Sequence, residues 1–449
     1  MRRFRVFNLC AAAILPMLGC CQLAAAPVKV EVVRSGDSWE LRRAGKPFFV
    51  KGAGGTNRFD QLAAAGANSV RTWGADNLEP LLDEAHRNGL AVTVGIWLRH
   101  EGDEGEGGKF SYENPQMVQA QLQLVRKAVL RYKDHPAVLM WGIGNEMEGY
   151  GDGDHPVIWK HVNEAARLAK SLDTNHPVMT VIVELGGKRI QSVNQYCPDV
   201  DIVGINTYAG ASSIATRYAA LKPAKPYLIA EFGPPGFWEV GKTAWGAPIE
   251  PTSPEKAESY RRAYLGSIQQ QPCCLGSYAF FWGNKQECTA TWFGMFLPDG
   301  TKVNALDTMT ELWTGKPPQA ACPVIKELKP AGSTRLNPGE PLKIRLVAVD
   351  PANRPFRVRW VVQPEQTRTL GAGREEPLLP ELRSAIQNGD ERGCEITAPQ
   401  NAGGYRVFAY VHNDAGASVG NVPFQVTVST RQTHPEVRTV PPETASRAN

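Results

Sequence analysis

The sequence has few of the features that would point to a highly charged partner or to a membrane-spanning segment. Its formal net charge is only +4 over 449 residues, and no long run of like charges occurs. Neither nucleic acid nor an anionic membrane surface is therefore an expected partner. The apolar stretch from Leu9 to Gly19 is too short to cross a bilayer. The composition, with 42% hydrophobic and 21% charged residues, is that of an ordinary globular protein.

Motifs that bind metals or nucleotides are also missing. The nine cysteines include no CxxC pair, so zinc-ligand spacing is absent. The glycine-rich stretch 52–57 lacks the third glycine of the dinucleotide fingerprint, and we interpret it as a turn. The acidic loop 101–109 does not have the residue order of a calcium loop and is expected to be a solvated rim loop. We predict no metal and no cofactor.

The N-terminal residues indicate export. Three arginines within the first five residues precede the short apolar stretch, which is the order found in secretory signals. Residues 17–20 resemble a bacterial lipobox with Cys20 as the lipidated residue, whereas residues 24–26 resemble a signal-peptidase site. The sequence around each candidate cleavage point is imperfect, and both alternatives remain open. We predict a signal peptide over 1–26 and a location in the periplasm, at the cell surface or in the outer membrane as a lipoprotein.

Six cysteines lie beyond this segment, and an exported protein can form disulfides. We expect them to be buried apolar residues or disulfide partners, with a pairing that the sequence does not give. They are Cys197, Cys273, Cys274, Cys288, Cys322 and Cys394.

From residue 47 to residue 315 the chain alternates short apolar runs with amphipathic helical segments. This alternation predicts a parallel sheet. The expected strands are 48–52, 69–73, 90–98, 138–143, 178–183, 202–206, 227–230 and 277–282. Eight such units within about 270 residues match the usual size of a (β/α)8 TIM barrel, and continuously apolar strands suit a sheet covered on both faces. An open doubly wound sheet is less favoured because it usually has fewer strands.

The character of the sequence changes after the last of these units. Residues 316–325 are rich in proline and alanine and are interpreted as a linker. Segments that alternate like strands follow, and they predict a small immunoglobulin-like β-sandwich over 326–430. Residues 431–449 are polar and are predicted to be disordered. The barrel domain is assigned to 27–315 and opens with a short hairpin over 28–45.

Two of the predicted barrel strands end in a glutamate. Glu146 follows the fourth strand in the pair Asn145-Glu146, and Glu231 ends the seventh. The chemistry of such barrels sits at the carboxyl ends of the strands, so both carboxylates should share one end of the barrel. A retaining glycosidase needs one carboxylic acid as proton donor and one carboxylate as nucleophile, about 5–5.5 Å apart. Structural ion pairs are the alternative interpretation. Three other acids are rival candidates: Glu148, Glu184 and Glu287.

These motifs resemble clan A of the glycoside hydrolases, whose barrels carry catalytic acids after strands four and seven. The run Val-Arg-Thr-Trp on the second strand, which includes Arg71, is similar to the second strand of the clan. The segment 59–95 is similar to the catalytic barrel of glycoside hydrolase family 2, and the resemblance covers roughly 45–315. Tyr208 and Trp282 fall where the clan places a tyrosine that contacts the nucleophile and a tryptophan that contacts the sugar.

The resemblance implies a role for each residue. Glu146 would be the general acid/base and Glu231 the nucleophile, with Arg71 keeping Glu231 ionised. Asn145 would hydrogen-bond the sugar 2-hydroxyl, and Tyr208 would donate a hydrogen bond to Glu231. The implied sugar-contacting residues are Trp282, as a stacking platform, and Trp97 and His100, in the glycone subsite. Packing without sugar contact is the alternative for these aromatic residues. The same two alternatives apply to the insertion 233–250, whose aromatic residues could build a subsite wall.

The resemblance as a whole implies a retaining β-glycosidase that acts on a β-linked oligo- or polysaccharide. Two alternatives remain open, namely a transglycosidase of the glucanosyltransferase type and a non-catalytic carbohydrate-binding surface protein. Family 2 enzymes usually carry β domains before the barrel, where this chain has a short hairpin, so their substrate preferences are not carried over. Family 5 barrels share the same skeleton, which leaves the family number open.

Overall fold

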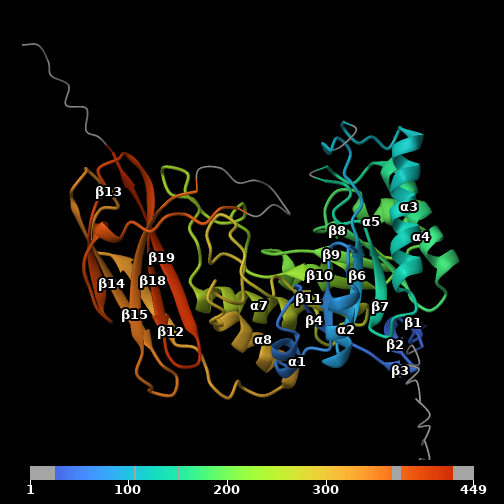
Figure 1. Cartoon of the computed structure of the whole chain (residues 1–449), viewed down its shortest axis with the longest axis horizontal. Helices are drawn as coiled ribbons and strands as arrows, with labels where there is room; N and C mark the ends of the chain where they lie inside the picture. The colour runs from blue at the N-terminus through green and yellow to red at the C-terminus, as the bar shows by residue number, and fades with distance from the viewer. Residues whose placement is uncertain (1–25, 106–107, 150, 367–375, 428–449) are drawn as a thin grey trace, which may run out of the picture.

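A computed structural model describes residues 26–105, 108–149, 151–366 and 376–427. Figure 1 shows a barrel and a smaller sandwich lying side by side, with helices α7 (Ser253–Ser267) and α8 (Asn304–Thr314) on the side of the barrel next to the sandwich. The predicted lipidation site Cys20 and the predicted disordered tail lie outside the described residues, as does the predicted signal peptide except for Ala26.

The barrel is a closed sheet of eight parallel strands in the cyclic order β10-β11-β4-β5-β6-β7-β8-β9. The strands are β4 (Val50–Gly54), β5 (Ser69–Arg71), β6 (Ala91–Ile96), β7 (Val138–Ile143), β8 (Val178–Val183), β9 (Ile202–Asn206), β10 (Tyr227–Phe232) and β11 (Cys274–Ala279). Every residue of β6, β7, β9, β10 and β11 is buried, as expected for a sheet covered on both faces. The predicted (β/α)8 barrel is confirmed.

A helical segment follows each barrel strand. The helices are α1 (Phe59–Ala64), α2 (Glu79–Arg87), α3 (Pro115–Tyr132), α4 (Pro156–Leu172), α5 (Arg189–Tyr196), α6 (Ile214–Ala220) with the 3₁₀ turn Ala211–Ser213, α7 and α8. Helix α3 begins with a cap, because the Asn114 side chain accepts hydrogen bonds from the backbone N–H groups of Gln116 and Met117. Helix α5 is short and mostly polar, so its helical period is weak.

The amino end of the barrel is covered by a small sheet of β1 (Val30–Ser35), β2 (Ser38–Arg43) and β3 (Lys46–Pro47). Val30 and Leu41 pack in one apolar cluster with the interior residues Leu139 and Met179. The carboxyl end of the barrel is free of this cover and carries the polar strand ends, as in other barrels of this architecture.

The C-terminal part is a sandwich of two four-stranded sheets, in the orders β12-β14-β17-β16 and β13-β19-β18-β15. Its strands are β12 (Val324–Pro330), β13 (Arg335–Leu336), β14 (Pro341–Val349), β15 (Arg357–Pro364), β16 (Ile386–Gly389), β17 (Gly393–Thr397), β18 (Gly403–His412) and β19 (Ala417–Val426). With the strands named A to G in chain order and β13 as an added edge strand, these sheets are ABED and GFC, the immunoglobulin arrangement. Strand β12 begins inside the segment that we interpreted as a linker.

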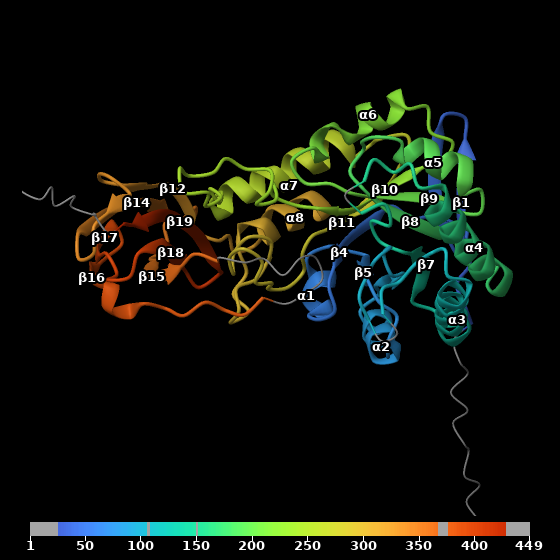
Figure 2. The same cartoon turned by 90° about the horizontal axis from the view of Figure 1, so that it is seen from above.

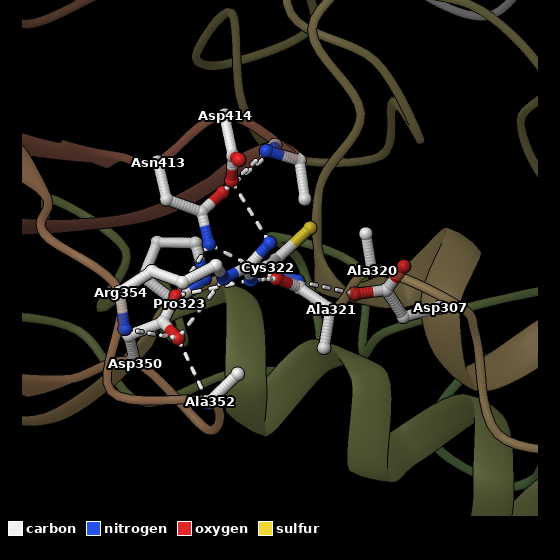
Figure 3. A network of polar contacts seen from close by, with 12 residues as sticks. Asp307, Ala320, Ala321, Cys322, Pro323, Asp350, Ala352, Arg354, Asn413 and Asp414 are labelled. Atoms are coloured by element: carbon white, nitrogen blue, oxygen red, sulfur yellow. Dashed lines mark hydrogen bonds and ion pairs between the residues drawn. The ribbon is translucent and has the colours of Figure 1, made fainter.

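The sandwich and the barrel share a packed boundary (Figure 2). Val419 of β19 belongs to the same apolar cluster as Tyr260 of α7. Polar contacts continue this boundary at the connection between the two parts (Figure 3), where Asp307 of α8 accepts a hydrogen bond from the backbone of Cys322. Arg354 binds Asp350 at 3.0 Å and also donates to a carbonyl of the connecting segment. The sandwich therefore packs against α7 and α8 and is not joined to the barrel by the connecting segment alone.

All six described cysteines are unpaired in this structure, and five of them are buried. This favours the interpretation as buried apolar residues over that as disulfide partners. Within the described part of the chain, no helix combines the length and apolarity needed to cross a membrane.

Candidate active site

Glu231 lies near the carboxyl end of β10 and accepts hydrogen bonds from three side chains. Arg71 of β5 donates from Nη1 at 3.0 Å, and Trp73 donates from Nε1 at 2.7 Å, both to Oε1. The Tyr208 hydroxyl donates to Oε2 at 2.9 Å. The residue is only 7% exposed. Because an ionised carboxylate accepts hydrogen bonds and donates none, this ring of donors suits a negatively charged Glu231.

Glu146 lies just beyond the end of β7 in a turn where its backbone has a φ of +54°. This left-handed conformation is uncommon for a residue with a side chain. One side chain contacts the carboxylate, since Asn206 Nδ2 donates to Oε1 at 2.7 Å. Burial and the negative charge of Glu231 raise the pKa of Glu146, and the Asn206 hydrogen bond opposes this rise. Glu146 thus keeps its proton to higher pH than an ordinary glutamate does.

Asn145 connects the two carboxylates. Its Oδ1 accepts hydrogen bonds from Arg71 Nη2 at 2.7 Å and from Asn206 Nδ2 at 3.2 Å. Since both donors bind the oxygen, the amide NH₂ group of Asn145 is turned away from them. The predicted residues Arg71, Asn145, Glu146 and Glu231 therefore meet in one hydrogen-bond network, to which β5, β7, β9 and β10 all contribute.

Tyr208 follows β9 and reaches Glu231 as the sequence analysis expected. Burial and the negative charge of Glu231 raise the pKa of the Tyr208 phenol well above its usual value. The hydroxyl group is consequently a permanent donor near neutral pH.

His100 and Trp97 lie after β6, beside the turn that carries Glu146. His100 Nε2 lies 2.9 Å from the Asn145 carbonyl oxygen and 3.1 Å from that of Glu146. Trp97 packs edge-on against the His100 ring with 5.6 Å between centroids and is 40% exposed. His100 thus contacts the backbone of the turn that carries Glu146, and Trp97 presents an accessible indole beside His100.

The structure corrects the prediction for Trp282. This side chain is completely buried, its Nε1 donates to the Asn57 carbonyl, and its ring packs edge-on against Phe296. A ring without exposed surface does not offer a face to a sugar, so Trp282 is a core residue. The physical reason is the strand boundary: β11 ends at Ala279, three residues before the end that was predicted.

Three site residues were not singled out by the sequence analysis. Trp73 and Asn206 each donate to one of the two carboxylates. Phe280 packs edge-on against both Trp73 and Tyr208, at 5.9 Å in each case, and its bond to Phe281 is a cis peptide. Trp73 stands two residues after Arg71, and Asn206 is the last residue of a barrel strand, so both positions carried a signal that strand-end counting could have used.

The rival acids are engaged in ion pairs. Glu148 binds Arg189 at 2.9 Å and accepts from the Val183 backbone, and burial raises its pKa to about 7. Glu184 binds Arg217 at 2.8 Å, and Glu287 binds Lys285 at 2.5 Å. In the described residues, no group of three or more His, Cys, Asp or Glu side chains could hold a metal ion.

The sequence of the barrel matches a known family. The model for "Glycosyl hydrolases family 2, TIM barrel domain" covers residues 56–262. A probable mannan endo-1,4-beta-mannosidase A-2 of Aspergillus terreus is 29% identical over 132 residues, 27% of this chain and 33% of that protein. A Streptococcus agalactiae beta-glucuronidase is 26% identical over 193 residues, 38% of this chain and 31% of that protein. The chain spans about a third of the length of these curated relatives.

Solved structures also align with this chain. A calcium-binding mutant of Bacteroides uniformis beta-glucuronidase 2 aligns with 89% of this chain and 48% of its own, at 15% identity and a TM-score of 0.50. A beta-D-glucuronidase of Dictyoglomus thermophilum aligns with 65% of this chain and 54% of its own, at 21% identity and a TM-score of 0.49. At such identity the likeness concerns the fold alone. Residues 56–262 thus match a glycoside hydrolase family 2 TIM-barrel domain, and the barrel is distantly similar to glycoside hydrolases of clan A.

Proposed function

We propose that this protein is a retaining β-glycosidase that hydrolyses O-glycosidic bonds of a β-linked glycan. The observation that carries the proposal is the unequal pair of carboxyl groups at one end of the barrel. Glu231 is surrounded by donors, whereas Glu146 has a raised pKa. Double displacement needs such a pair, with one group ionised and the other protonated at the same pH.

In the proposed first step, the Glu231 carboxylate attacks the anomeric carbon and the Glu146 carboxylic acid protonates the leaving oxygen. In the second step, Glu146 removes a proton from water, and that water releases the sugar from Glu231. The free NH₂ group of Asn145 is suited to donate a hydrogen bond to the sugar 2-hydroxyl. Tyr208 and Trp73 keep the attacking carboxylate oriented.

The substrate is proposed as a class only. Among the similar proteins, an Aspergillus fumigatus protein named mannan endo-1,4-beta-mannosidase F is 27% identical over 207 residues, whereas the Streptococcus agalactiae relative is named beta-glucuronidase. A neutral β-linked polysaccharide and a β-glucuronide are therefore the two substrate classes to compare first.

The test is a screen of the full-length mature protein against β-mannan, β-glucans, xylan and aryl β-glycosides, including an aryl β-glucuronide. We expect release of reducing sugar or phenol from at least one substrate, with retention of the β-configuration in the first product detected by ¹H NMR. A first product with inverted configuration, or no product from any substrate, would overturn the proposal. Glu231→Gln is the control for contaminating activity.

Transglycosylation is the second candidate activity, because the same carboxylates would serve it and only the acceptor differs. A retained product with increased chain length, at a rate above that of hydrolysis, would favour it. A protein that binds glycans without any turnover would instead support the carbohydrate-binding alternative.

We further propose that the chain is exported, on the basis of the arginines and the apolar stretch at its N-terminus. Labelling with a palmitate analogue in a bacterial host separates the two alternatives. Label that disappears in Cys20→Ser would establish the lipoprotein, and an unlabelled protein cleaved near residue 26 would establish simple secretion.

A further inference from the structure

Two tryptophans are more exposed to solvent than the other nine. The structure describes all eleven tryptophans, and only Trp97 and Trp238 are exposed, at 40% and 53% of their surfaces. Both lie at the rim of the candidate active site, Trp97 beside His100 and Trp238 beside Tyr208. Single exposed apolar side chains are common, but an exposed indole beside a catalytic centre is a feature of ligand sites.

The loop after β10 holds Trp238 in place. The indole lies against Gly236, where an added Cβ would come within 2.5 Å of ring atoms. The carboxylate of Glu239 accepts hydrogen bonds from the backbone N–H groups of Gly236 at 2.8 Å and Ala209 at 3.1 Å. The loop is thereby tied to the segment that follows β9. An exposed ring fixed in this way loses little freedom when a ligand binds.

Packed aromatic rings support Trp238 from inside the protein. Phe237 contacts it edge-on with 4.8 Å between centroids, and Phe293 lies tilted at 6.1 Å. Tyr208 meets it edge-on at 5.8 Å, and the hydroxyl of Tyr208 reaches Glu231. Trp238 is therefore separated from the carboxylate by one aromatic side chain. A sugar bound to the exposed indole would therefore lie next to the sugar that Glu231 attacks, in a separate position.

We propose that Trp238 is the platform of an additional sugar subsite, adjacent to the position attacked by Glu231, and that the substrate is a chain of at least two β-linked sugars. The inference rests on the proposed glycosidase function and narrows its substrate class. The ligand is a pyranose whose C–H groups point to one face, as in β-linked hexose chains, because such a face is apolar and covers an indole.

The experiment compares long and short substrates in the full-length protein. The kinetic constants kcat and KM are measured for wild type and Trp238→Ala with mannotetraose, cellotetraose and the 4-nitrophenyl β-glycosides of the matching single sugars. We expect kcat/KM for the cleaved tetrasaccharide to fall about 10- to 100-fold, a range typical for truncation of a tryptophan that binding buries. The single-sugar glycoside should change less than about threefold, because it does not reach the platform.

Two further variants serve as controls. Trp238→Phe should recover most of the loss on the tetrasaccharide, since it retains an aromatic face. Trp39→Phe, at the covered amino end of the barrel, should leave both substrates unchanged. Circular dichroism and the melting temperature show whether Trp238→Ala is folded.

The outcomes separate the two proposals. Equal losses on long and short substrates, or no loss on either, would overturn the platform while leaving the glycosidase intact, as would a wild-type enzyme that cleaves only single-sugar glycosides. If the wild-type protein cleaves nothing, the glycosidase proposal fails, and the platform is tested by retardation in native gels containing β-mannan or β-glucan. Retardation that Trp238→Ala abolishes would support the platform, and equal migration of both proteins would overturn it.

Discussion

The two carboxyl groups at the end of the barrel differ in their hydrogen-bond partners. Glu231 accepts from a guanidinium, an indole and a phenol, whereas Glu146 accepts from a single amide. Glu231 is part of a strand, and Glu146 lies in a turn with a left-handed backbone. Two residues of one type thus have different hydrogen-bond surroundings, and burial together with the negative charge of Glu231 raises the pKa of Glu146.

This difference follows from which strands supply the donors. The residues around Glu231 come from the second and sixth barrel units, and together they place one positive charge and two neutral donors on the carboxylate. Glu146 receives no hydrogen bond from a cation within the described residues, and burial and the negative charge of Glu231 raise its pKa. In the proposed mechanism Glu231 attacks and Glu146 transfers the proton, and substitutions at the two residues test these roles separately.

The largest effect is expected for Glu231. Glu231→Gln keeps the shape but removes the anionic nucleophile, and we expect kcat to fall on the order of 10⁴- to 10⁶-fold. In Glu231→Ala, azide enters from the opposite face, so the rescued product should be a glycosyl azide with inverted configuration, identified by ¹H NMR. Wild-type rates in Glu231→Gln on every active substrate would contradict the assignment.

The loss of activity in a Glu146 variant should depend on the leaving group of the substrate, whereas the loss in a Glu231 variant should not. Glu146→Ala removes the proton donor, and we expect a loss of about 10²- to 10⁴-fold on natural glycans. An aryl glycoside with an acidic phenol needs little protonation and should lose less in its first step. Azide should now give a glycosyl azide with retained configuration, because it replaces water in the second step. An inverted azide product here would mean that the two roles are exchanged.

Much of this comparison could be predicted from strand counting. The positions of Glu146, Glu231, Arg71 and Tyr208 depend only on which strand each follows, and apolar runs identify the strands reliably in a parallel barrel. The family resemblance then supplied the expected contact between Tyr208 and Glu231, which the structure contains.

What could not be predicted depends on strand boundaries and on contacts between distant loops. Because the predicted end of β11 was three residues too late, Trp282 was expected in the sugar site, where Phe280 was overlooked. The hydrogen bond from Asn206 to Glu146 joins residues 60 positions apart, and no local pattern encodes it. The exposure of Trp238 likewise depends on how its indole packs against Gly236 within the same loop.

A smaller effect is expected from removal of one donor to Glu231. Trp73→Phe keeps an aromatic ring but deletes the indole N–H group, whose nitrogen lies 2.7 Å from Glu231 Oε1. Hydrogen bonds to charged groups contribute about 1.5–3 kcal/mol, so kcat/KM should fall roughly 10- to 100-fold. Trp313→Phe is the matched control, because the Trp313 N–H is buried and makes no hydrogen bond in the described structure. If both variants lost equal activity, the donor ring around Glu231 would not explain its role.

The smallest effect concerns the pH profile. Glu146 must be protonated to act as an acid, so kcat/KM falls as the pH rises through its pKa. The Asn206 amide favours the ionised form and lowers this pKa, and Asn206→Ala should therefore move the basic limb to higher pH. Loss of the Glu231 charge acts in the opposite direction, so the pKa of Glu146 followed by ¹³C NMR should fall in Glu231→Gln. If Asn206→Ala and Glu231→Gln both shifted the pKa of Glu146 in the same direction, the Asn206 hydrogen bond and the Glu231 charge would not explain the difference between the two carboxyl groups.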